Sequence, residues 1–331
     1  MGLVKAITLC EVGPRDGLQS EKTLLTTEQK VELINDMTAA GFRVIEVGSF
    51  VNPKAVPQMA DTDDVFTRIA KAPDVEYRAL IANLRGVRRA AGCGCRKVKL
   101  NVSASTAHNL ANLNCTPSES VAGFKSCVEE AQNCNIAVSG SISMAFGSPW
   151  DKEIPIGDVK KVVEAYLAAG VTEISLSDAA GVAYPSQVFD MGKEMLQEYP
   201  QVKWWLHFHN TRGLGIANIL AGMEAGFTNY DTSFGGVGGC PFVPGAAGNV
   251  TTEDVLHMCE QMKITTGIDL DLAMAVSKKA VSMLGHGTDS YLLRAGKAGD
   301  LIRELPKGQI ENQVIIKNIP PADSHAGAQP V

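Results

Sequence analysis

Two histidines, His207 and His209, occupy alternate positions in the apolar segment 204–209. Alternate residues of a β-strand share a face, so both imidazoles would point the same way and could bind one metal ion. Two buried histidines without such a shared ligand would each need a separate hydrogen-bond partner. The spacing therefore indicates a metal site, and a chance pair of core histidines is the alternative that the rest of the sequence has to exclude.

The elements that would position this pair are indicated by a regular alternation along the chain. Short segments rich in β-forming residues alternate with segments of helical periodicity. The expected strands are residues 6–12, 43–48, 77–82, 97–102, 136–143, 171–176, 203–208 and 228–232. Eight such units predict a closed (β/α)8 TIM barrel of the α/β class. An open doubly wound sheet is the alternative, but no Gly-x-Gly-x-x-Gly motif opens a first helix.

Glycines at the junctions between the units support this division. Gly41, Gly92, Gly170 and Gly226 each follow a helical segment and precede an expected strand. Glycine is favoured just past the end of a helix because it adopts the left-handed conformation without steric cost. We therefore expect each of the four to end a helix.

The expected domain organisation is one large domain with a short extension. The barrel would occupy residues 1–290 and include an added amphipathic helix over residues 269–284. Residues 291–317 would form a C-terminal helical extension, with a helix at 295–305. These added helices could cover the barrel or a subunit interface, and we expect a homo-oligomer, most simply a dimer. Residues 318–331 are rich in Pro, Ala, Gly and Ser, which predicts a disordered tail.

Composition and charge limit the class of partner. The chain has 331 residues, of which 45% are hydrophobic and 20% charged, as expected for a soluble globular protein. Its net charge of −6 and the absence of a Lys/Arg-rich tract argue against a nucleic acid or an anionic membrane as partner. Eight cysteines are too few for a disulfide framework, and no export, transit or lipidation signal is recognisable at the amino terminus. We therefore expect a cytoplasmic protein with a small-molecule substrate.

Polar residues gather where the expected strands end, which is where the active site of a TIM barrel is built. Arg15 and Asp16 follow the first strand, Glu46 lies within the second and Asp178 ends the sixth. The alternative for Arg15 and Asp16 is a solvated ion pair on the surface. A glycine-rich segment, 235–249, follows the eighth strand, and the density of glycine in it favours a mobile loop or close approach of backbone to a ligand. Cys240 and Asn249 lie in this segment.

A ligand set for the metal can be assembled from these positions. Asp16 and Asn249 would contribute oxygen, and His207 and His209 would contribute nitrogen. This mixture, with room for water and substrate, suits Mg²⁺ or Mn²⁺ better than a closed structural zinc site. Catalysis is therefore the better explanation of the pattern.

Several separated motifs resemble one enzyme family. They are Glu-Val-Gly-Pro-Arg-Asp-Gly-Leu-Gln-Ser-Glu-Lys at residues 11–22, Ser-Phe-Val-Asn-Pro-Lys at 49–54, Gly-Cys-Pro at 239–241 and Gly-Asn at 248–249. In this order, over about residues 7 to 268, they resemble 3-hydroxy-3-methylglutaryl-CoA lyase. The resemblance implies a metal-dependent TIM barrel that cleaves an acyl-CoA thioester to acetyl-CoA and acetoacetate.

The resemblance also implies roles for individual residues. Asp16, His207, His209 and Asn249 would hold the metal, Arg15 would stabilise the enolate oxygen, and Cys240 would lie on a loop that closes over the substrate. Glu46 and Asp178 would support the site or transfer protons. Lys22 would bind coenzyme A, and Gln19, Ser105, Ser141 and Arg212 would contact the substrate.

The expected chemistry fits these residues. A retro-Claisen cleavage requires a deprotonated tertiary hydroxyl, which a metal favours, and a stabilised enolate as the carbon–carbon bond breaks. Arg15 would supply the second requirement. The enolate then needs a proton, for which the Cys240 thiol and a water at the metal are the two candidates.

The sequence departs from the family pattern around the acyl group. Members related to the mitochondrial enzyme have Asp-Thr-Tyr-Gly where this chain has residues 210–213, Tyr at the position of Ser141, and Asp-Thr at residues 178–179. These changes remove an aromatic wall and add the Arg212 guanidinium near the mouth. The alternatives are therefore a lyase for another thioester, such as citramalyl-CoA, and a condensing synthase of the isopropylmalate synthase type. The synthase is disfavoured because only about sixty residues follow the barrel, and a non-catalytic metal-binding scaffold would leave Arg15 and Cys240 unexplained.

Overall fold

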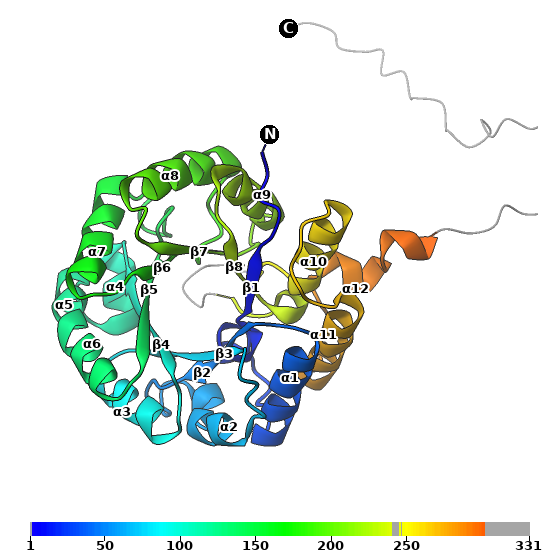
Figure 1. Ribbon diagram of the computed structural model, residues 1–331, viewed down its shortest axis with the longest axis horizontal. Helices are drawn as coiled ribbons and strands as arrows, with labels where there is room; N and C mark the ends of the chain where they lie inside the picture. Colours follow the sequence, from blue (N-terminus) through cyan, green and yellow to red (C-terminus); the bar gives the residue numbers. More distant parts are fainter. Residues whose placement is uncertain (1, 240–244, 246, 302–331) are drawn as a thin grey trace, which may run out of the picture. The chain divides into compact units, whose positions relative to one another are not determined.

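In the computed structural model, which describes residues 2–239, 245 and 247–301, eight parallel strands form a closed barrel in sequence order (Figure 1). β8 pairs with β1 and closes the sheet. The strands are β1 (Thr8–Glu11), β2 (Val44–Ser49), β3 (Glu76–Ile81), β4 (Lys97–Ser103), β5 (Ala137–Ser143), β6 (Glu173–Asp178), β7 (Lys203–Phe208) and β8 (Asn229–Thr232). All eight predicted strands are therefore confirmed, with ends that shift by one or two residues.

Helices surround the barrel on its outer side (Figure 1). They are α1 (Thr27–Ala39), α2 (Thr62–Arg68), α3 (Leu84–Gly92), α4 (Thr106–Leu113), α5 (Pro117–Ala122), α6 (Phe124–Asn133), α7 (Ile156–Ala168), α8 (Pro185–Glu198), α9 (Gly215–Ala225), α10 (Thr252–Gln261), α11 (Leu270–Leu284) and α12 (Tyr291–Ala295). Single turns are η1 (Gly13–Gly17), η2 (Pro57–Met59), η3 (Phe234–Gly236) and η4 (Ala298–Leu301). The helix predicted at 269–284 is α11, and Asp269 caps its first turn through a bond from the backbone nitrogen of Leu272.

Two details of the sequence prediction are wrong. Gly41, Gly170 and Gly226 have positive φ angles just past a helix, as predicted, but Gly92 is the last residue of α3, and Gly94 has the left-handed φ of 75°. The helix predicted at 295–305 begins too late, because α12 ends at Ala295 and only the turn η4 follows within the described residues. Ser290 sets this earlier start, since its hydroxyl accepts the backbone N–H of Leu293.

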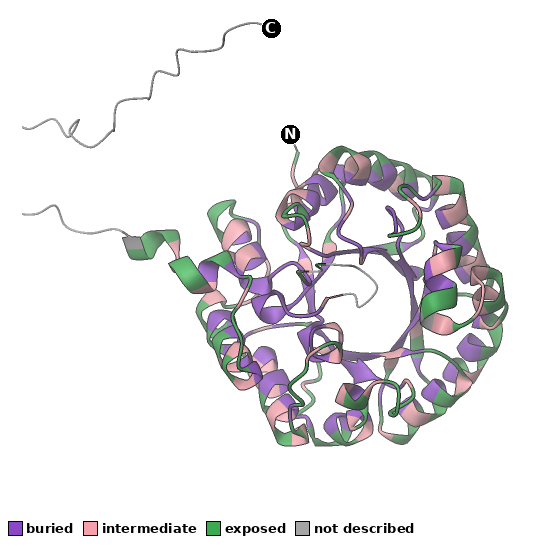
Figure 2. Ribbon diagram, turned by 180° about the vertical axis from the view of Figure 1, so that it is seen from behind, coloured by how far each residue is buried: buried purple, intermediate pink, exposed green. Residues whose placement is uncertain are grey.

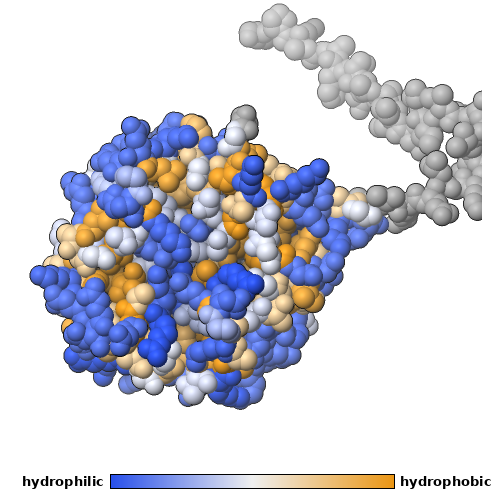
Figure 3. Space-filling view, viewed as in Figure 1, coloured by the Kyte–Doolittle hydropathy of each residue, from blue (hydrophilic) through white to orange (hydrophobic). Residues whose placement is uncertain are grey.

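The hydrophobic core lies between the strands and the helices, and the inner wall of the barrel is polar. β4 illustrates this, because Val98, Leu100 and Val102 join the main apolar cluster while Lys99 and Asn101 alternate with them. The strands are buried over most of their length, whereas the outer helix faces are exposed (Figure 2). Most of the periphery is accordingly hydrophilic (Figure 3).

Charged groups fill the amino-terminal end of the barrel. Glu173, the first residue of β6, accepts from Arg78 at 3.0 Å and from Lys97 at 2.9 Å. The Arg78 guanidinium also lies 4.7 Å from the ring centre of Trp205 on β7. Burial alone would raise the pKa of the Glu173 carboxyl, but the Arg78 and Lys97 charges lower it to about 2. This cluster closes the barrel at the end opposite the predicted site.

Backbone contacts divide the chain into two units, Met1–Gly296 and Lys297–Val331. The first holds the barrel and α10 to α12, and the second contributes only η4 to the described residues. The predicted tail at 318–331 lies outside those residues. No helix in the described part of the chain has the length and apolar content needed to cross a bilayer. The seven described cysteines are all unpaired.

A glycine in β5 provides a test of how tightly the core is packed. An added Cβ at Gly140 would lie 2.7 Å from the ring of Tyr166, which stacks on Phe124 and donates its hydroxyl to the Leu100 and Ser141 carbonyls. Gly140→Ala is therefore expected to lower the free energy of unfolding by about 1–3 kcal/mol. Gly157→Ala in α7 is the control, because nothing lies within 4 Å of its added Cβ. Equal midpoints of denaturant unfolding for the two variants would contradict this packing.

Candidate metal centre and active site

Three side chains converge at the carboxyl end of the barrel as the sequence predicts. His207 lies in β7 and His209 follows that strand, so their alternate positions bring the two Nε2 atoms within 3.1 Å of each other. Asp16 is presented by η1, and its Oδ2 lies 3.6 Å from His209 Nε2 and 3.9 Å from His207 Nε2. Single ligand atoms of these three residues all lie within 4.8 Å of one another. No other group of three or more potential His, Cys, Asp or Glu ligands occurs among the described residues.

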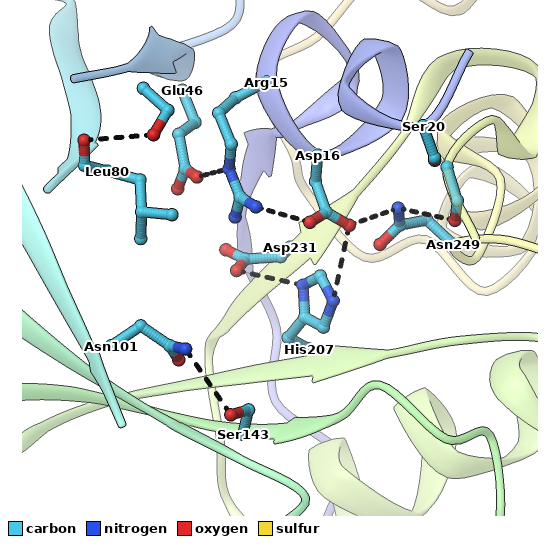
Figure 4. Close-up of polar contacts among 12 residues, drawn as sticks. Arg15, Asp16, Ser20, Glu46, Leu80, Asn101, Ser143, His207, Asp231 and Asn249 are labelled. Atoms are coloured by element: carbon cyan, nitrogen blue, oxygen red, sulfur yellow. Dashed lines mark hydrogen bonds and ion pairs between the residues drawn. The ribbon is translucent and has the colours of Figure 1, made fainter. Parts of the chain in front are cut away.

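Asn249 is brought to this cluster by backbone pairing. The segment around it adds to the end of β7, since Asn210 N–H bonds the Gly248 carbonyl at 2.8 Å and Val250 N–H bonds the Phe208 carbonyl at 3.1 Å. Its Nδ2 donates to Asp16 Oδ2 at 2.7 Å and lies near the Val237 and Gly238 carbonyls (Figure 4). The amide orientation is therefore fixed, and Oδ1 is buried without a partner among the described residues.

Only glycine fits at the point where the segment 235–239 passes this amide. Gly238 has a φ of 99°, and an added Cβ there would lie 2.6 Å from the Asp16 carbonyl and 2.9 Å from Asn249 Nδ2. The close approach at this residue is to Asp16 and Asn249, and the predicted approach of backbone to a ligand stays a prediction. The backbone at Gly238 therefore lies against both Asp16 and Asn249.

The four residues fit a divalent cation. Asn249 Oδ1 is a buried oxygen with no hydrogen-bond partner in the described part of the chain, and buried oxygens without partners are rare in native proteins. The separation of 3.1 Å between the histidine Nε2 atoms suits two ligands each about 2.1 Å from one ion at a right angle. Burial alone would raise the pKa of the Asp16 carboxyl, but Arg15 and His209 hold it well below its usual range, so Asp16 is an anion. Two nitrogens, a carboxylate and an amide oxygen suit an ion with open positions.

Arg15 lies beside this cluster and is held from two sides. Its Nη1 donates to Asp16 Oδ1 at 2.5 Å, and its Nε donates to Glu46 Oε1 on β2 (Figure 4). Burial would lower the pKa of the guanidinium, but the Glu46 and Asp16 carboxylates raise it, so the cation is permanent. No hydrogen bond to a described residue is recorded for Nη2, which leaves that nitrogen for a ligand.

Two site residues were missed by the sequence analysis. Asp231 on β8 has its Oδ2 3.3 Å from His207 Nδ1, which fixes the ring with Nε2 toward Asp16. Lys99 on β4 places its Nζ 2.5 Å from Glu46 Oε2 and 3.3 Å from Asp231 Oδ2. Both lie on strands that alternate polar and apolar residues, Lys-Val-Lys-Leu-Asn-Val-Ser and Asn-Tyr-Asp-Thr, whereas Glu46 is an acid in an apolar segment of β2. The local signal at Lys99 and Asp231 is therefore weaker than the signal that identified Glu46.

Two buried glutamates organise the loops that carry the site. Glu11, the last residue of β1, accepts the N–H groups of Gly13 at 2.8 Å and Phe234 at 3.0 Å and so joins η1 to η3. Burial raises the pKa of its carboxyl to about 8. Glu253 accepts the N–H of Gly235 at 3.1 Å and thereby holds the start of the glycine-rich segment.

Asp178 and Arg212 lie in adjoining loops. Asp178 is fully buried at the end of β6, and its carboxylate accepts the N–H groups of Val182 at 3.0 Å and Ala183 at 2.9 Å. Burial raises the pKa of this carboxyl. Arg212 is exposed and donates from Nη1 to the Ala180 and Gly181 carbonyls, so it supports the same loop.

The remaining predicted residues are spread around the mouth. Lys22 is exposed and Gln19 half-buried. Ser141 is buried on β5, and two residues farther along this strand the Ser143 hydroxyl accepts from Asn101 Nδ2 on β4 (Figure 4). Ser105 is buried, caps α4 through the His108 N–H and donates to Asp151 at 2.6 Å, so its hydroxyl is used within the fold. Cys240 lies outside the described residues.

Known proteins resemble this chain over nearly its whole length. The HMGL-like family model matches residues 6–279. A hydroxymethylglutaryl-CoA lyase of Bacillus subtilis is 38% identical over 89% of this chain and 98% of its own, and a 3-hydroxy-3-isohexenylglutaryl-CoA/hydroxymethylglutaryl-CoA lyase of Pseudomonas aeruginosa is 38% identical over 90% and 98%. The structure of an HMG-CoA lyase from Acinetobacter baumannii in complex with coenzyme A and 3-methylmalate superimposes with a TM-score of 0.87, at 42% identity, over 92% of this chain and 100% of that one.

Removal of either histidine should abolish tight metal binding. His207→Ala and His209→Ala each delete one nitrogen from the cluster, and we expect Mn²⁺ affinity, measured by titration of metal-free protein, to fall at least about tenfold. His257→Ala is the control, because that residue lies on α10 and pairs with Glu260. Wild-type affinity in both variants, or an equal loss in the control, would contradict the assignment.

Proposed function

The chain belongs to the hydroxymethylglutaryl-CoA lyase family and is a carbon–carbon lyase, and we propose that it cleaves 3-hydroxy-3-methylglutaryl-CoA to acetyl-CoA and acetoacetate. The observation that carries the proposal is the junction of Arg15 with Asp16, which puts a fixed cation next to a metal ligand. A retro-Claisen cleavage needs a metal ion that favours ionisation of the hydroxyl and a cationic donor that stabilises the enolate. We also propose that the protein acts as a homodimer in the cytoplasm.

Asp16, His207, His209 and Asn249 would hold a divalent cation, for which we propose Mg²⁺ or Mn²⁺. When bound there, such a cation polarises the substrate oxygens and favours ionisation of the tertiary hydroxyl. Asp231 prepares the site for it by holding the His207 ring through Nδ1. Asn249 holds the Asp16 carboxylate in place, because its Nδ2 donates to Asp16 Oδ2.

Arg15 would stabilise the charge that develops during bond cleavage. The tertiary hydroxyl loses its proton, the bond between C2 and C3 breaks, its electron pair enters the thioester as an enolate, and C3 becomes the ketone of acetoacetate. Arg15 Nη2, which makes no hydrogen bond to a described residue, would donate to the enolate oxygen. Glu46 and Asp16 hold the guanidinium in advance, so it need not reorganise as the enolate forms.

Asp178 suits proton transfer better than Glu46. Burial raises the pKa of Asp178 toward the range of a general base. For Glu46 burial acts in the same direction, but Arg15 and Lys99 prevail and lower its pKa, which makes it a weak base and a charge anchor. Because Asp178 is fully buried, the substrate proton would reach it through water or after a shift of the loop that it caps.

We propose Cys240 as the donor that protonates the enolate carbon. A thiol suits this step because it is a stronger acid than the carbon it would protonate. The residue before it, Gly239, bonds Ser20 Oγ through its backbone nitrogen at 3.2 Å, four residues beyond Asp16. The last described residue before Cys240 is therefore bonded to the same segment, between β1 and α1, that carries Asp16.

Binding of the thioester would use residues around the mouth of the barrel. Lys22 is an exposed cation that suits the phosphates of coenzyme A. Gln19, Ser105, Ser141 and Arg212 remain proposed substrate contacts, with Ser105 acting through the helix α4 that it caps. The wall that β4 and β5 contribute is polar, with Asn101 donating to Ser143. This polarity keeps citramalyl-CoA, whose carboxylate is attached to the hydroxyl carbon, as the second candidate substrate.

A thioester panel tests the proposed substrate. We expect acetyl-CoA release to be fastest from 3-hydroxy-3-methylglutaryl-CoA, with slower release from 3-hydroxy-3-isohexenylglutaryl-CoA and citramalyl-CoA. Chelation should stop release and added Mg²⁺ or Mn²⁺ should restore it. Faster release from citramalyl-CoA would replace the proposed substrate, and activity that survives chelation would overturn the metal requirement.

Arg15→Lys tests the enolate role. Lysine keeps the charge beside Asp16 but loses the planar pair of donors, so turnover should fall about a hundredfold while KM changes little, because the lost contact forms mainly as charge develops. Arg43→Lys, which alters an exposed ion pair with Asp74, is the matched control. A raised KM with normal turnover would make Arg15 a substrate anchor instead.

A further inference from the structure

Six side chains around the metal centre form a closed ring of charged or ionisable groups, which we call the charge ring. Its members, in order, are Asp16, Arg15, Glu46, Lys99, Asp231 and His207. Asp16, Arg15 and His207 belong to the site already described. Lys99 closes the ring on its far side.

Lys99 links the two halves of the site. Its Nζ lies 2.5 Å from Glu46 Oε2 and 3.3 Å from Asp231 Oδ2, and the side chain is 3% exposed. Glu46 uses its other oxygen to hold Arg15, and Asp231 uses Oδ2 also to hold His207 at 3.3 Å. One ammonium group therefore contacts both carboxylates that orient the catalytic arginine and the metal-binding histidine.

The arrangement needs this cation for charge balance. Glu46 is 0% and Asp231 3% exposed. Lys99 Nζ contacts both carboxylates, and Arg15 is the other cation in contact with Glu46. Without Lys99, these two buried carboxylates would lose the cation that they share and the contact that fixes their positions relative to Arg15 and His207.

We propose that Lys99 is a positioning residue that sets Arg15 and His207 at once, through Glu46 and Asp231. The proposal rests on the proposed function for its effect on turnover, but its effect on metal affinity is independent of the substrate. Substitution of a lysine with a purely structural role would lower stability without a specific effect on turnover or metal affinity.

Lys99→Met removes the ammonium and keeps an unbranched side chain. Lys97→Met is the matched control, because Lys97 lies on the same face of β4 and its buried end pairs with Glu173, away from the ring. For Lys99→Met we expect a fall in kcat of about 10- to 100-fold, a rise of about tenfold in the Mn²⁺ dissociation constant of metal-free protein, and KM within about threefold. For Lys97→Met all three should stay within about threefold of wild type.

Each outcome decides the proposal. Unchanged kcat and Mn²⁺ affinity in folded Lys99→Met, or equal losses in Lys97→Met, would overturn it. If Lys99→Met does not fold, Lys99→Gln, which keeps a hydrogen-bond donor, is measured in the same way and should show the same losses. If Lys99→Gln folds with wild-type values, or neither Lys99 variant folds while Lys97→Met does, the positioning role is rejected. If the wild type cleaves none of the thioesters tested, the proposed function fails, and the Mn²⁺ comparison alone still decides the role of Lys99.

Discussion

The structure depends on one electrostatic constraint, which is that Asp16, Glu46 and Asp231 carry negative charge inside a buried space. An unpaired buried carboxylate is too costly to persist as an anion, so each must have a cation in contact. Arg15 lies between Asp16 and Glu46, and Lys99 lies between Glu46 and Asp231. The one gap in this alternation of charge lies between Asp16 and the two histidines, and it is where a divalent cation fits.

The fold satisfies this constraint because a parallel barrel carries two different surfaces. Apolar residues on the outer side of each strand pack against helices and stabilise the protein. The residues of the inner wall can therefore be polar. Side chains from β2, β4, β7 and β8 then meet inside the barrel. Glu46 and Asp231, which both contact Lys99, are 185 positions apart in the sequence. The loops after β1 and β8 add Asp16 and Asn249 at the rim, where the backbone at Gly238 lies against both. Stability and chemistry are thereby assigned to opposite faces of the same strands.

Much of this could be predicted from the sequence because the relevant signals are local. Alternation of apolar residues gave all eight strands, and the spacing of His207 and His209 gave the face that they share. Lys99 and Asp231 were missed because their meaning depends on strand register, which local patterns do not contain. Gly92 was misplaced as a helix end for a related reason. Gly92 and Gly94 both follow the same helical segment, and only the backbone path shows that Gly94 takes the left-handed conformation.

A crystal structure of the protein with Mn²⁺, analysed by anomalous scattering, tests the central claim most directly. The account predicts a single strong peak at the rim of the barrel, about 2.1 Å from Asp16 Oδ2, from Nε2 of His207 and His209, and from Asn249 Oδ1. Asp231 and Lys99 should keep their contacts with His207 and Glu46 in that structure. A peak elsewhere, no peak at saturating Mn²⁺, or an ion bound directly by Glu46 or Asp231 would contradict the account.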